Sequence, residues 1–163
     1  MGSVAGDQVL CVLADTLLQK NWMLTTAESC TGGAIAKACT DLAGSSAWFE
    51  RGFVTYSNEA KQDMLGVPAA ILAEYGAVSE AVTAAMATGA LLHSRAQVAV
   101  SVSGIAGPGG GTITKPVGMV CFGWAAQDGK VRTTTQYFQG DREAVRYQAV
   151  QYALQGVLQM LAD

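Results

Sequence analysis

Charged residues are scarce in this sequence of 163 residues. Asp, Glu, Lys and Arg make up 14% of it, the net charge is −3, and there is a single histidine. Because a basic excess is absent, we expect no nucleic-acid partner. Half of the residues are hydrophobic, which excludes a disordered chain, since disorder requires few apolar residues and a high net charge.

Long apolar runs and metal-ligand motifs are also missing. No run approaches the roughly 20 apolar residues that span a bilayer, and the N-terminus lacks the pattern of a signal peptide, so we expect no membrane association. None of the four cysteines belongs to a CxxC pair or to a cluster with zinc-ligand spacing, and no metal is expected. We interpret them as free thiols in a reducing, cytoplasmic compartment. They are Cys11, Cys30, Cys39 and Cys121.

The order of the predicted elements indicates an α/β fold with three layers, α/β/α, around a mixed sheet. The length fits one domain over residues 1–163. Asp128-Gly129 predicts a hairpin, and Ser79 and Asp141 are suitable helix N-caps. Helices are expected over residues 7–20, 34–39, 58–65, 69–74, 79–93 and 141–161. Strands are expected over residues 22–27, 49–56, 97–103, 117–126 and 130–138.

A serine stands where the first strand passes into the second helix. Free N–H groups at the start of that helix could hold a phosphate, or an oxyanion formed when Ser29 attacks a carbonyl. The alternative is that Ser29 or Thr31 only caps the helix. Cys30 is a second candidate nucleophile, because a thiol at a helix N-terminus has a lowered pKa.

A nucleophilic serine needs a base. His93 lies at the end of a predicted helix and is expected to interact with the helix terminus or solvent, which argues against a Ser-His-Asp triad. A carboxylate such as Glu28 or a lysine with a lowered pKa remains. Lys61, on the first turns of the helix after Tyr56, can point back over the strand ends, and burial would favour its neutral form. The alternative is an exposed Lys61, with the Tyr56 ring in the core.

Two further segments are candidates for ligand contact. Residues 101–111 leave a strand and enter a glycine-rich loop that is neither a P-loop nor a GxGxxG motif opening a helix. Such a loop fits phosphate or ring binding and simple flexibility equally well. Ser103, at the strand end, is better placed to face a ligand than the serines inside the strand. Arg142, in the first turn of the last helix, could clamp a phosphate or pair with a surface carboxylate such as Glu143.

Several motifs in order resemble the C-terminal domain of the competence/damage-inducible protein CinA. The resemblance extends from the first strand to the last helix, and without the separate N-terminal domain of full-length CinA we expect the single-domain form. The motifs are Ala27-Glu28-Ser29-Cys30-Thr31-Gly32-Gly33, Gly44-Ser45-Ser46-Ala47-Trp48-Phe49, Tyr56-Ser57-Asn58-Glu59-Ala60-Lys61, Gly76-Ala77-Val78-Ser79-Glu80, Ser103-Gly104-Ile105-Ala106-Gly107-Pro108 and Lys115-Pro116-Val117-Gly118.

The resemblance implies an amidohydrolase of pyridine nucleotide salvage. Stand-alone members of the family convert nicotinamide mononucleotide to nicotinic acid mononucleotide and ammonia. They are Ser/Lys hydrolases, and the matching residues are Ser29 and Lys61, with Tyr56 nearby as a third catalytic candidate in the hydrogen-bond chain. The resemblance also implies a homo-oligomer, commonly a dimer, and no metal or organic cofactor. A non-catalytic nucleotide-binding module and an amidase for another small amide are the alternatives.

The same resemblance suggests roles in binding a small nucleotide. N–H groups around Cys30 and Thr31 would stabilise the oxyanion, Ser103 and Gly104 would contact the ribose or ring, and Arg142, or Ser45 with Ser46, would hold the phosphate. Residues 109–113 depart from the family's usual loop, which leaves contacts from that loop open. The substrate-binding candidates are Cys30, Thr31, Gly32, Ser45, Ser46, Ser103, Gly104 and Arg142.

Overall fold

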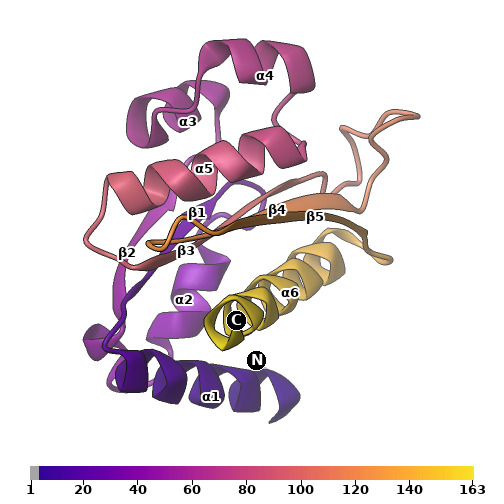
Figure 1. The fold of residues 1–163 in the computed structure, drawn as a ribbon. Coiled ribbons are helices and arrows are strands. Elements are labelled where there is room, and N and C mark those ends of the chain that lie inside the picture. Colours follow the sequence, from indigo (N-terminus) through magenta and orange to yellow (C-terminus); the bar gives the residue numbers. More distant parts are fainter. Residues whose placement is uncertain (1–3) are drawn as a thin grey trace.

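A five-stranded mixed sheet lies between two layers of helices in the computed structural model, which describes residues 4–163 (Figure 1). The strand order is β2-β1-β3-β4-β5. β1 pairs in parallel with β2 and β3, whereas β4 pairs antiparallel with both β3 and β5. The predicted α/β/α architecture with a mixed sheet is therefore confirmed. The strands are β1 (Leu24–Glu28), β2 (Phe49–Val54), β3 (Val98–Gly104), β4 (Met119–Ala126) and β5 (Val131–Tyr137).

The helices divide between the two faces of the sheet. α1, α2 and α6 cover one face, and α5 covers the other, with α3 and α4 packed on its outer side (Figure 1). Their bounds are α1 (Val4–Lys20), α2 (Ala34–Thr40), α3 (Asn58–Leu65), α4 (Ala69–Tyr75), α5 (Glu80–Leu92) and α6 (Arg142–Ala162), and a short 3-10 turn, η1, spans Ser45–Ala47.

The side chains of β3 point alternately to the two faces of the sheet and so contribute to the hydrophobic core on each face. Val98, Val100 and Val102 are fully buried against α1 and α6, whereas Ala99 faces the α5 side. The small residues on that side let α5 approach closely. A Cβ at Gly123 would lie 2.4 Å from the Thr83 carbonyl oxygen, so only glycine fits there.

The local signals for turns and caps are confirmed. The Ser79 side chain accepts a hydrogen bond from the Val82 N–H at 3.2 Å, and the Asp141 side chain accepts one from the Ala144 N–H at 2.9 Å. Gly129 takes a φ of 94° in the β4–β5 hairpin, a conformation that favours glycine. Helix ends differ from prediction by one residue at most, apart from the start of α1, which lies three residues before the expected position.

The prediction that β2 reaches Tyr56 was wrong. The strand ends at Val54, and the last pairing with β1 is the Thr55 N–H donating to the Glu28 carbonyl oxygen at 2.8 Å. Beyond that bond the chain turns away from the sheet. The carbonyl groups of residues 55–57 consequently face the Lys61 side chain instead of a neighbouring strand.

The topology brings three loops to one edge of the sheet. β1, β2 and β3 are parallel, and Glu28 pairs with Val54 on one side and with Val102 on the other, so the carboxyl ends of the three strands lie at one edge. The start of α6 reaches the same edge, where Arg142 contacts the loop after β3. The carboxyl edge of a mainly parallel sheet is where ligands bind in open α/β folds, so this edge is the place to look for a site.

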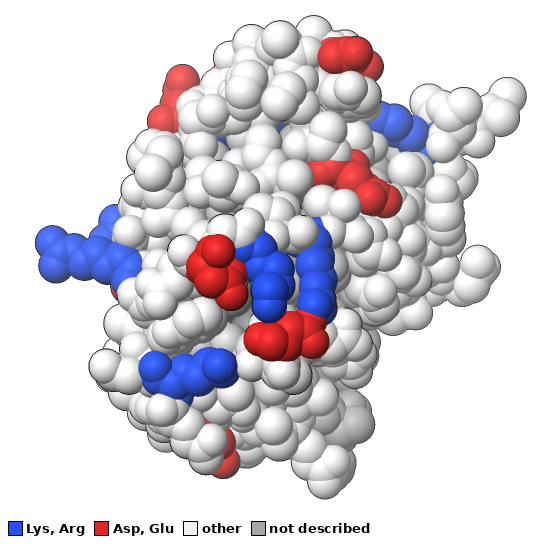
Figure 2. Space-filling view, in the orientation of Figure 1, with Lys and Arg blue, Asp and Glu red and all other residues white. Residues whose placement is uncertain are grey.

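The surface carries mixed charge. On the face shown in Figure 2, Lys and Arg side chains alternate with Asp and Glu, and most of the surface is uncharged. None of the helices in residues 4–163 combines the length and the apolar character needed to cross a bilayer.

Candidate active site

Ser29 begins a tight turn directly after β1. Its N–H donates to the Val102 carbonyl oxygen of β3 at 3.0 Å, and its own carbonyl accepts from the Gly32 N–H at 3.1 Å. Gly32 and Gly33 have φ values of 59° and 102°, a region that side chains disfavour. The two bonds and the two glycines fix the turn, which leaves the Ser29 hydroxyl at the carboxyl edge of the sheet.

Glu28 replaces Ser29 and Thr31 in the expected role of helix cap. Its carboxylate is fully buried and accepts from the Ile35 and Ala36 N–H groups of α2, at 2.9 and 3.0 Å. It also accepts from the Thr31 hydroxyl at 2.6 Å. A carboxylate bound by three donors at a helix start is a structural anchor, which argues against Glu28 as the base for Ser29.

Lys61 meets Ser29 inside the protein. The Nζ atom of Lys61 lies 3.1 Å from Ser29 Oγ, and only 1% of the lysine residue is exposed. Burial lowers the pKa of Lys61 from its ordinary value, and the neighbouring Cys30 acts weakly in the opposite direction. Because the lysine has no carboxylate partner among residues 4–163, burial disfavours the ammonium form without compensation from an ion pair.

Main-chain carbonyls orient the lysine nitrogen. Nζ donates to the carbonyl oxygens of Thr55 at 3.0 Å and Tyr56 at 3.2 Å, with a longer contact to Ser57 at 3.5 Å. A neutral amine has two N–H donors and one lone pair. In that neutral form the two shorter carbonyl contacts would use both donors and leave the lone pair facing the Ser29 hydroxyl, 3.1 Å away. The geometry is therefore suited to proton transfer from serine to lysine.

Tyr56 contributes to the site through its main chain. Its carbonyl oxygen contacts Lys61 Nζ and also lies 3.4 Å from Ser29 Oγ. The residue is 64% exposed and lines the cavity beside the serine, so its ring is not in the core. No hydrogen bond joins the phenol group to Ser29 or Lys61 among the described residues.

The environment of Cys30 argues against the alternative in which this thiol is the nucleophile. Burial raises the pKa of Cys30 to about 12, and the nearby Glu28 adds to the increase. Arg146 and Lys61 lower the pKa only partly. The turn around Cys30 also precedes a short helix whose first N–H groups are already bound by Glu28, so the helix offers the thiol little stabilisation.

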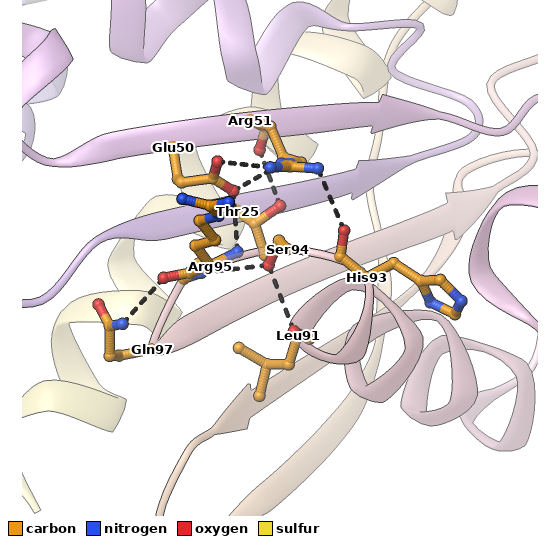
Figure 3. Close-up of polar contacts among 9 residues, drawn as sticks. Thr25, Glu50, Arg51, Leu91, His93, Ser94, Arg95 and Gln97 are labelled. Carbon is orange, nitrogen blue, oxygen red and sulfur yellow. Dashed lines mark hydrogen bonds and ion pairs between the residues drawn. The ribbon is translucent and has the colours of Figure 1, made fainter.

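His93 lies far from the serine. It follows α5, and its ring Nδ1 is 2.8 Å from the Gly89 carbonyl oxygen of the preceding turn. In Figure 3 it stands beside Arg51, whose guanidinium donates to the His93 carbonyl oxygen at 3.3 Å. Arg51 also pairs with Glu50, so this cluster holds β2 to the end of α5. The histidine is thus tied to its helix terminus, as predicted.

A cavity of about 290 Å³ opens beside the Ser29–Lys61 pair. Ser103 lines it, is 1% exposed, and its hydroxyl has no partner among residues 4–163. Arg142 also lines the cavity and donates to the Gly107 carbonyl oxygen at 2.8 Å, which leaves its other N–H groups available. Apolar groups complete the wall, namely Ala77, Val78, Ile105 and Ala106.

Gly104 and Gly32 serve the site through their size. A Cβ at Gly104 would lie 2.7 Å from the Val120 side chain, so a larger residue would push the end of β3 away from β4. Gly32 adopts its positive φ next to Arg146. Both glycines therefore affect the site through packing, because the lack of a side chain lets neighbouring atoms approach closely.

Ser45 and Ser46 are not brought to this cavity. They precede β2, and Trp48, which follows them, accepts from the N–H of Leu24 at the start of β1. They therefore lie at the amino edge of the parallel strands, opposite the edge that carries Ser29. Thr31 is fully buried behind the turn and is bound to Glu28.

Sequence reasoning overlooked Arg146. This residue lies one helical turn after Arg142 on α6, and its guanidinium reaches the turn that carries Ser29. The spacing of the two arginines, four residues apart, places them on the same side of the helix and was the available signal. No group of three or more His, Cys, Asp or Glu side chains among residues 4–163 is arranged to hold a metal ion.

The fold and the site together define an α/β domain with a buried Ser–Lys pair at the carboxyl edge of a mixed sheet. The family model of the CinA C-terminal domain matches residues 7–161, and the chain belongs to that family.

Individual relatives cover most of the chain. It is 63% identical over 142 residues to the nicotinamide-nucleotide amidohydrolase PncC of Enterobacter agglomerans, with 87% of each chain covered. The protein of that name from Escherichia coli strain K12 is 62% identical over 136 residues, covering 83% of this chain and 82% of the relative. The crystal structure of the competence/damage inducible protein CihA from Agrobacterium tumefaciens superposes with a TM-score of 0.96 at 43% identity, covering 100% and 99% of the two chains.

Proposed function

We propose that this protein hydrolyses the carboxamide of nicotinamide mononucleotide to nicotinic acid mononucleotide and ammonia, with Ser29 as nucleophile and Lys61 as base. The observation that carries the proposal is the 3.1 Å contact between a buried lysine nitrogen and a serine oxygen beside a cavity. The names of the relatives from Enterobacter agglomerans and Escherichia coli support the choice of substrate.

The first half-reaction forms an acyl-enzyme. Neutral Lys61 accepts the hydroxyl proton while Ser29 Oγ bonds to the carboxamide carbon, whose oxygen becomes an oxyanion. The N–H groups of Cys30 and Thr31 donate to no protein oxygen in the described part of the chain, so they are the available oxyanion donors. The intermediate collapses as its C–N bond breaks, and Lys61 returns its proton to the departing ammonia.

The second half-reaction releases the product. A water molecule takes the position of the departed ammonia, gives a proton to Lys61 and attacks the acyl carbon. The ester bond to Ser29 then breaks, and Lys61 returns the proton to Ser29 Oγ. The enzyme regains its starting state, and the product leaves as a carboxylate. No step requires a metal or an organic cofactor.

The cavity wall suits the two ends of a small nucleotide. The apolar residues around Ala77 and Ile105 can pack on the pyridine ring, and the unpartnered Ser103 hydroxyl can bind the carboxamide or the ribose. Arg142 supplies a cation with free N–H groups for the phosphate. These roles place the amide near Ser29 and the phosphate near the start of α6.

Two wider properties belong to the same proposal. A role in pyridine nucleotide salvage follows from the product, which is a nucleotide precursor. The homodimer and the cytoplasmic location implied by the resemblance stay predictions. The four cysteines are unpaired, which is consistent with a reducing compartment.

Incubation of the purified protein with nicotinamide mononucleotide tests the proposal. We expect equimolar release of ammonia and nicotinic acid mononucleotide, followed by an enzymatic ammonia assay and by chromatography. Free nicotinamide and the dinucleotide serve as comparison substrates. Binding of the mononucleotide without ammonia release would indicate a nucleotide-binding module. Faster turnover of free nicotinamide would indicate an amidase that does not recognise the phosphate.

A further inference from the structure

Arg146 holds the outer side of the nucleophile turn. Its Nε donates to the Cys30 carbonyl oxygen at 3.1 Å, and its Nη2 donates to the Thr31 carbonyl oxygen at 3.2 Å. The side chain is half-buried, and no carboxylate among residues 7–163 forms an ion pair with it. The guanidinium is thus committed to two consecutive carbonyl groups of the turn.

Peptide geometry connects these carbonyls to the proposed oxyanion donors. In a trans peptide the C=O of one residue and the N–H of the next point in opposite directions. Binding of the Cys30 carbonyl by Arg146 therefore turns the Thr31 N–H away from α6. The Cys30 N–H is fixed similarly, because the preceding Ser29 carbonyl accepts from the Gly32 N–H. Every carbonyl from Ser29 to Thr31 has a donor, while the N–H groups of Cys30 and Thr31 donate to no protein oxygen in the described part of the chain.

We propose that Arg146 is a positioning residue for the oxyanion site: it holds the Cys30 and Thr31 carbonyls so that the free N–H groups of the turn are fixed before substrate arrives. The proposal rests on the proposed function of Ser29. It assigns Arg146 no contact with substrate, in contrast to Arg142, which lines the cavity.

Gly32, in the same turn, leaves room for the Arg146 side chain. At Gly32, a Cβ would lie 3.3 Å from Arg146 Nη2, in addition to the strain of a side chain at φ 59°. The planar guanidinium presents parallel N–H donors, so one side chain can bind both carbonyls at once. A lysine offers a point charge without this geometry. The arrangement predicts that charge alone will not replace Arg146.

The test compares Arg146→Ala and Arg146→Lys with the wild-type protein in two assays. The first measures kcat and KM for nicotinamide mononucleotide. The second follows modification of Ser29 by an alkyl fluorophosphonate, detected by mass spectrometry. In that reaction the Oγ–P bond forms, the P–F bond breaks, fluoride leaves, and Lys61 takes the hydroxyl proton. The phosphonyl oxygen occupies the oxyanion position whichever amide is the natural substrate.

We expect Arg146→Ala to lower kcat by about 10- to 100-fold with little change in KM. This loss is smaller than the about 10²- to 10³-fold loss for deletion of an oxyanion donor, because the N–H groups are displaced and not removed. The rate of Ser29 phosphonylation should fall by a similar factor. Arg146→Lys should recover only part of either rate. Arg132→Ala is the matched control, since Arg132 is on β5 and pairs with Asp163 at the surface.

Three results would decide against the proposal. If Arg146→Ala phosphonylates and turns over at the wild-type rate, Arg146 does not position the turn. If Arg146→Lys fully restores both rates, the charge matters and the two-carbonyl geometry does not. If KM rises while kcat holds, Arg146 acts in binding.

Should Arg146→Ala fail to fold, Arg146→Lys alone gives the same comparison. Phosphonylation of wild-type Ser29 without ammonia release would overturn the proposed substrate and leave the Arg146 comparison intact, whereas an unreactive wild-type Ser29 would overturn both.

Discussion

Lys61 Nζ lies 3.1 Å from Ser29 Oγ although 32 positions separate the two residues in the sequence. Pairing of β1 with β2 brings them together, because the Thr55 N–H continues the ladder to the Glu28 carbonyl just before Ser29. α3 then starts at once, with Ser57 as N-cap, and its first turn directs Lys61 back over the strand ends. The dyad is therefore set by strand register and one helix cap.

Removal of either member of this pair should abolish most turnover. We expect Lys61→Met to lower kcat by about 10³-fold, within the range for loss of a general base, and Ser29→Ala to leave no acyl-enzyme pathway. Ammonia release from the mononucleotide measures both variants, and circular dichroism checks the fold. Lys130→Met, at the exposed hairpin, is the control for loss of a lysine. Substantial turnover by Ser29→Ala would show that another group attacks the amide.

Activity should rise with pH in a single ionisation step. The proposed mechanism needs neutral Lys61, and burial places the pKa of Lys61 below the ordinary lysine value of about 10.4. Below the pKa the ammonium cannot accept the Ser29 proton, so kcat/KM is low; above it the amine is free and kcat/KM reaches a plateau. A kcat/KM profile from pH 6 to pH 10 checks this expectation. The step should vanish from the residual activity of Lys61→Met, and a profile that falls over this range would contradict the assignment of the base.

The sequence was sufficient for features set by local chemistry. Ser79 and Asp141 were recognised because a cap depends on its own helix, and the Asp128-Gly129 turn because its backbone conformation selects glycine. Features that depend on contacts between distant segments were harder to predict. The end of β2 depended on where pairing with β1 stops, and the position of Ser45 depended on which edge of the sheet it reaches.

The site residues divide in the same way. The juxtaposition of Ser29 and Lys61 was predicted through the family resemblance, since spacing alone favours an ordinary exposed lysine. Arg146 went unnoticed because its role depends on α6 crossing the turn after β1, a contact between segments more than a hundred positions apart. Cys30 stayed an alternative on the sequence alone because a thiol pKa depends on burial as much as on a helix terminus.

The Cys30 thiol should be dispensable for catalysis. Its pKa of about 12 keeps it protonated near neutral pH, so it is a poor nucleophile. We expect Cys30→Ala to keep kcat within about threefold of wild type, at a cost of about 1 kcal/mol in the free energy of unfolding from lost buried volume. Ammonia release and urea denaturation give the two values. Loss of activity in Cys30→Ala, together with turnover by Ser29→Ala, would exchange the roles of the two residues.

Gly89 should connect the packing of α3 to catalysis. A Cβ there would lie 2.0 Å from the Leu65 carbonyl oxygen at the end of α3, the helix that carries Lys61. Gly89→Ala must push α3 outward, and we expect a loss of about 1–3 kcal/mol in the free energy of unfolding, typical of overpacking, together with a reduced kcat.

Gly156→Ala is the matched comparison for that experiment. Its Cβ would meet the Trp124 ring at 2.1 Å, so it overpacks the opposite face of the sheet, away from Lys61. Both variants should lower the thermal midpoint, and only Gly89→Ala should lower kcat at a temperature where both are folded. An equal loss of kcat in the two variants would mean that the effect comes from general destabilisation.

Arg142 should determine whether the phosphate of the substrate is recognised. It lines the cavity, has N–H donors beyond the one bound to Gly107, and is not needed for the dyad. A hydrogen bond to a charged group contributes about 1.5–3 kcal/mol, so Arg142→Ala should raise KM for nicotinamide mononucleotide by about 10- to 100-fold with little change in kcat. Turnover of the corresponding nucleoside, which lacks the phosphate, should be nearly unaffected. Arg132→Ala, on β5, controls for the loss of a surface arginine. If KM rises equally for nucleotide and nucleoside, Arg142 shapes the cavity through its bond to the Gly107 loop, and the phosphate must be held elsewhere.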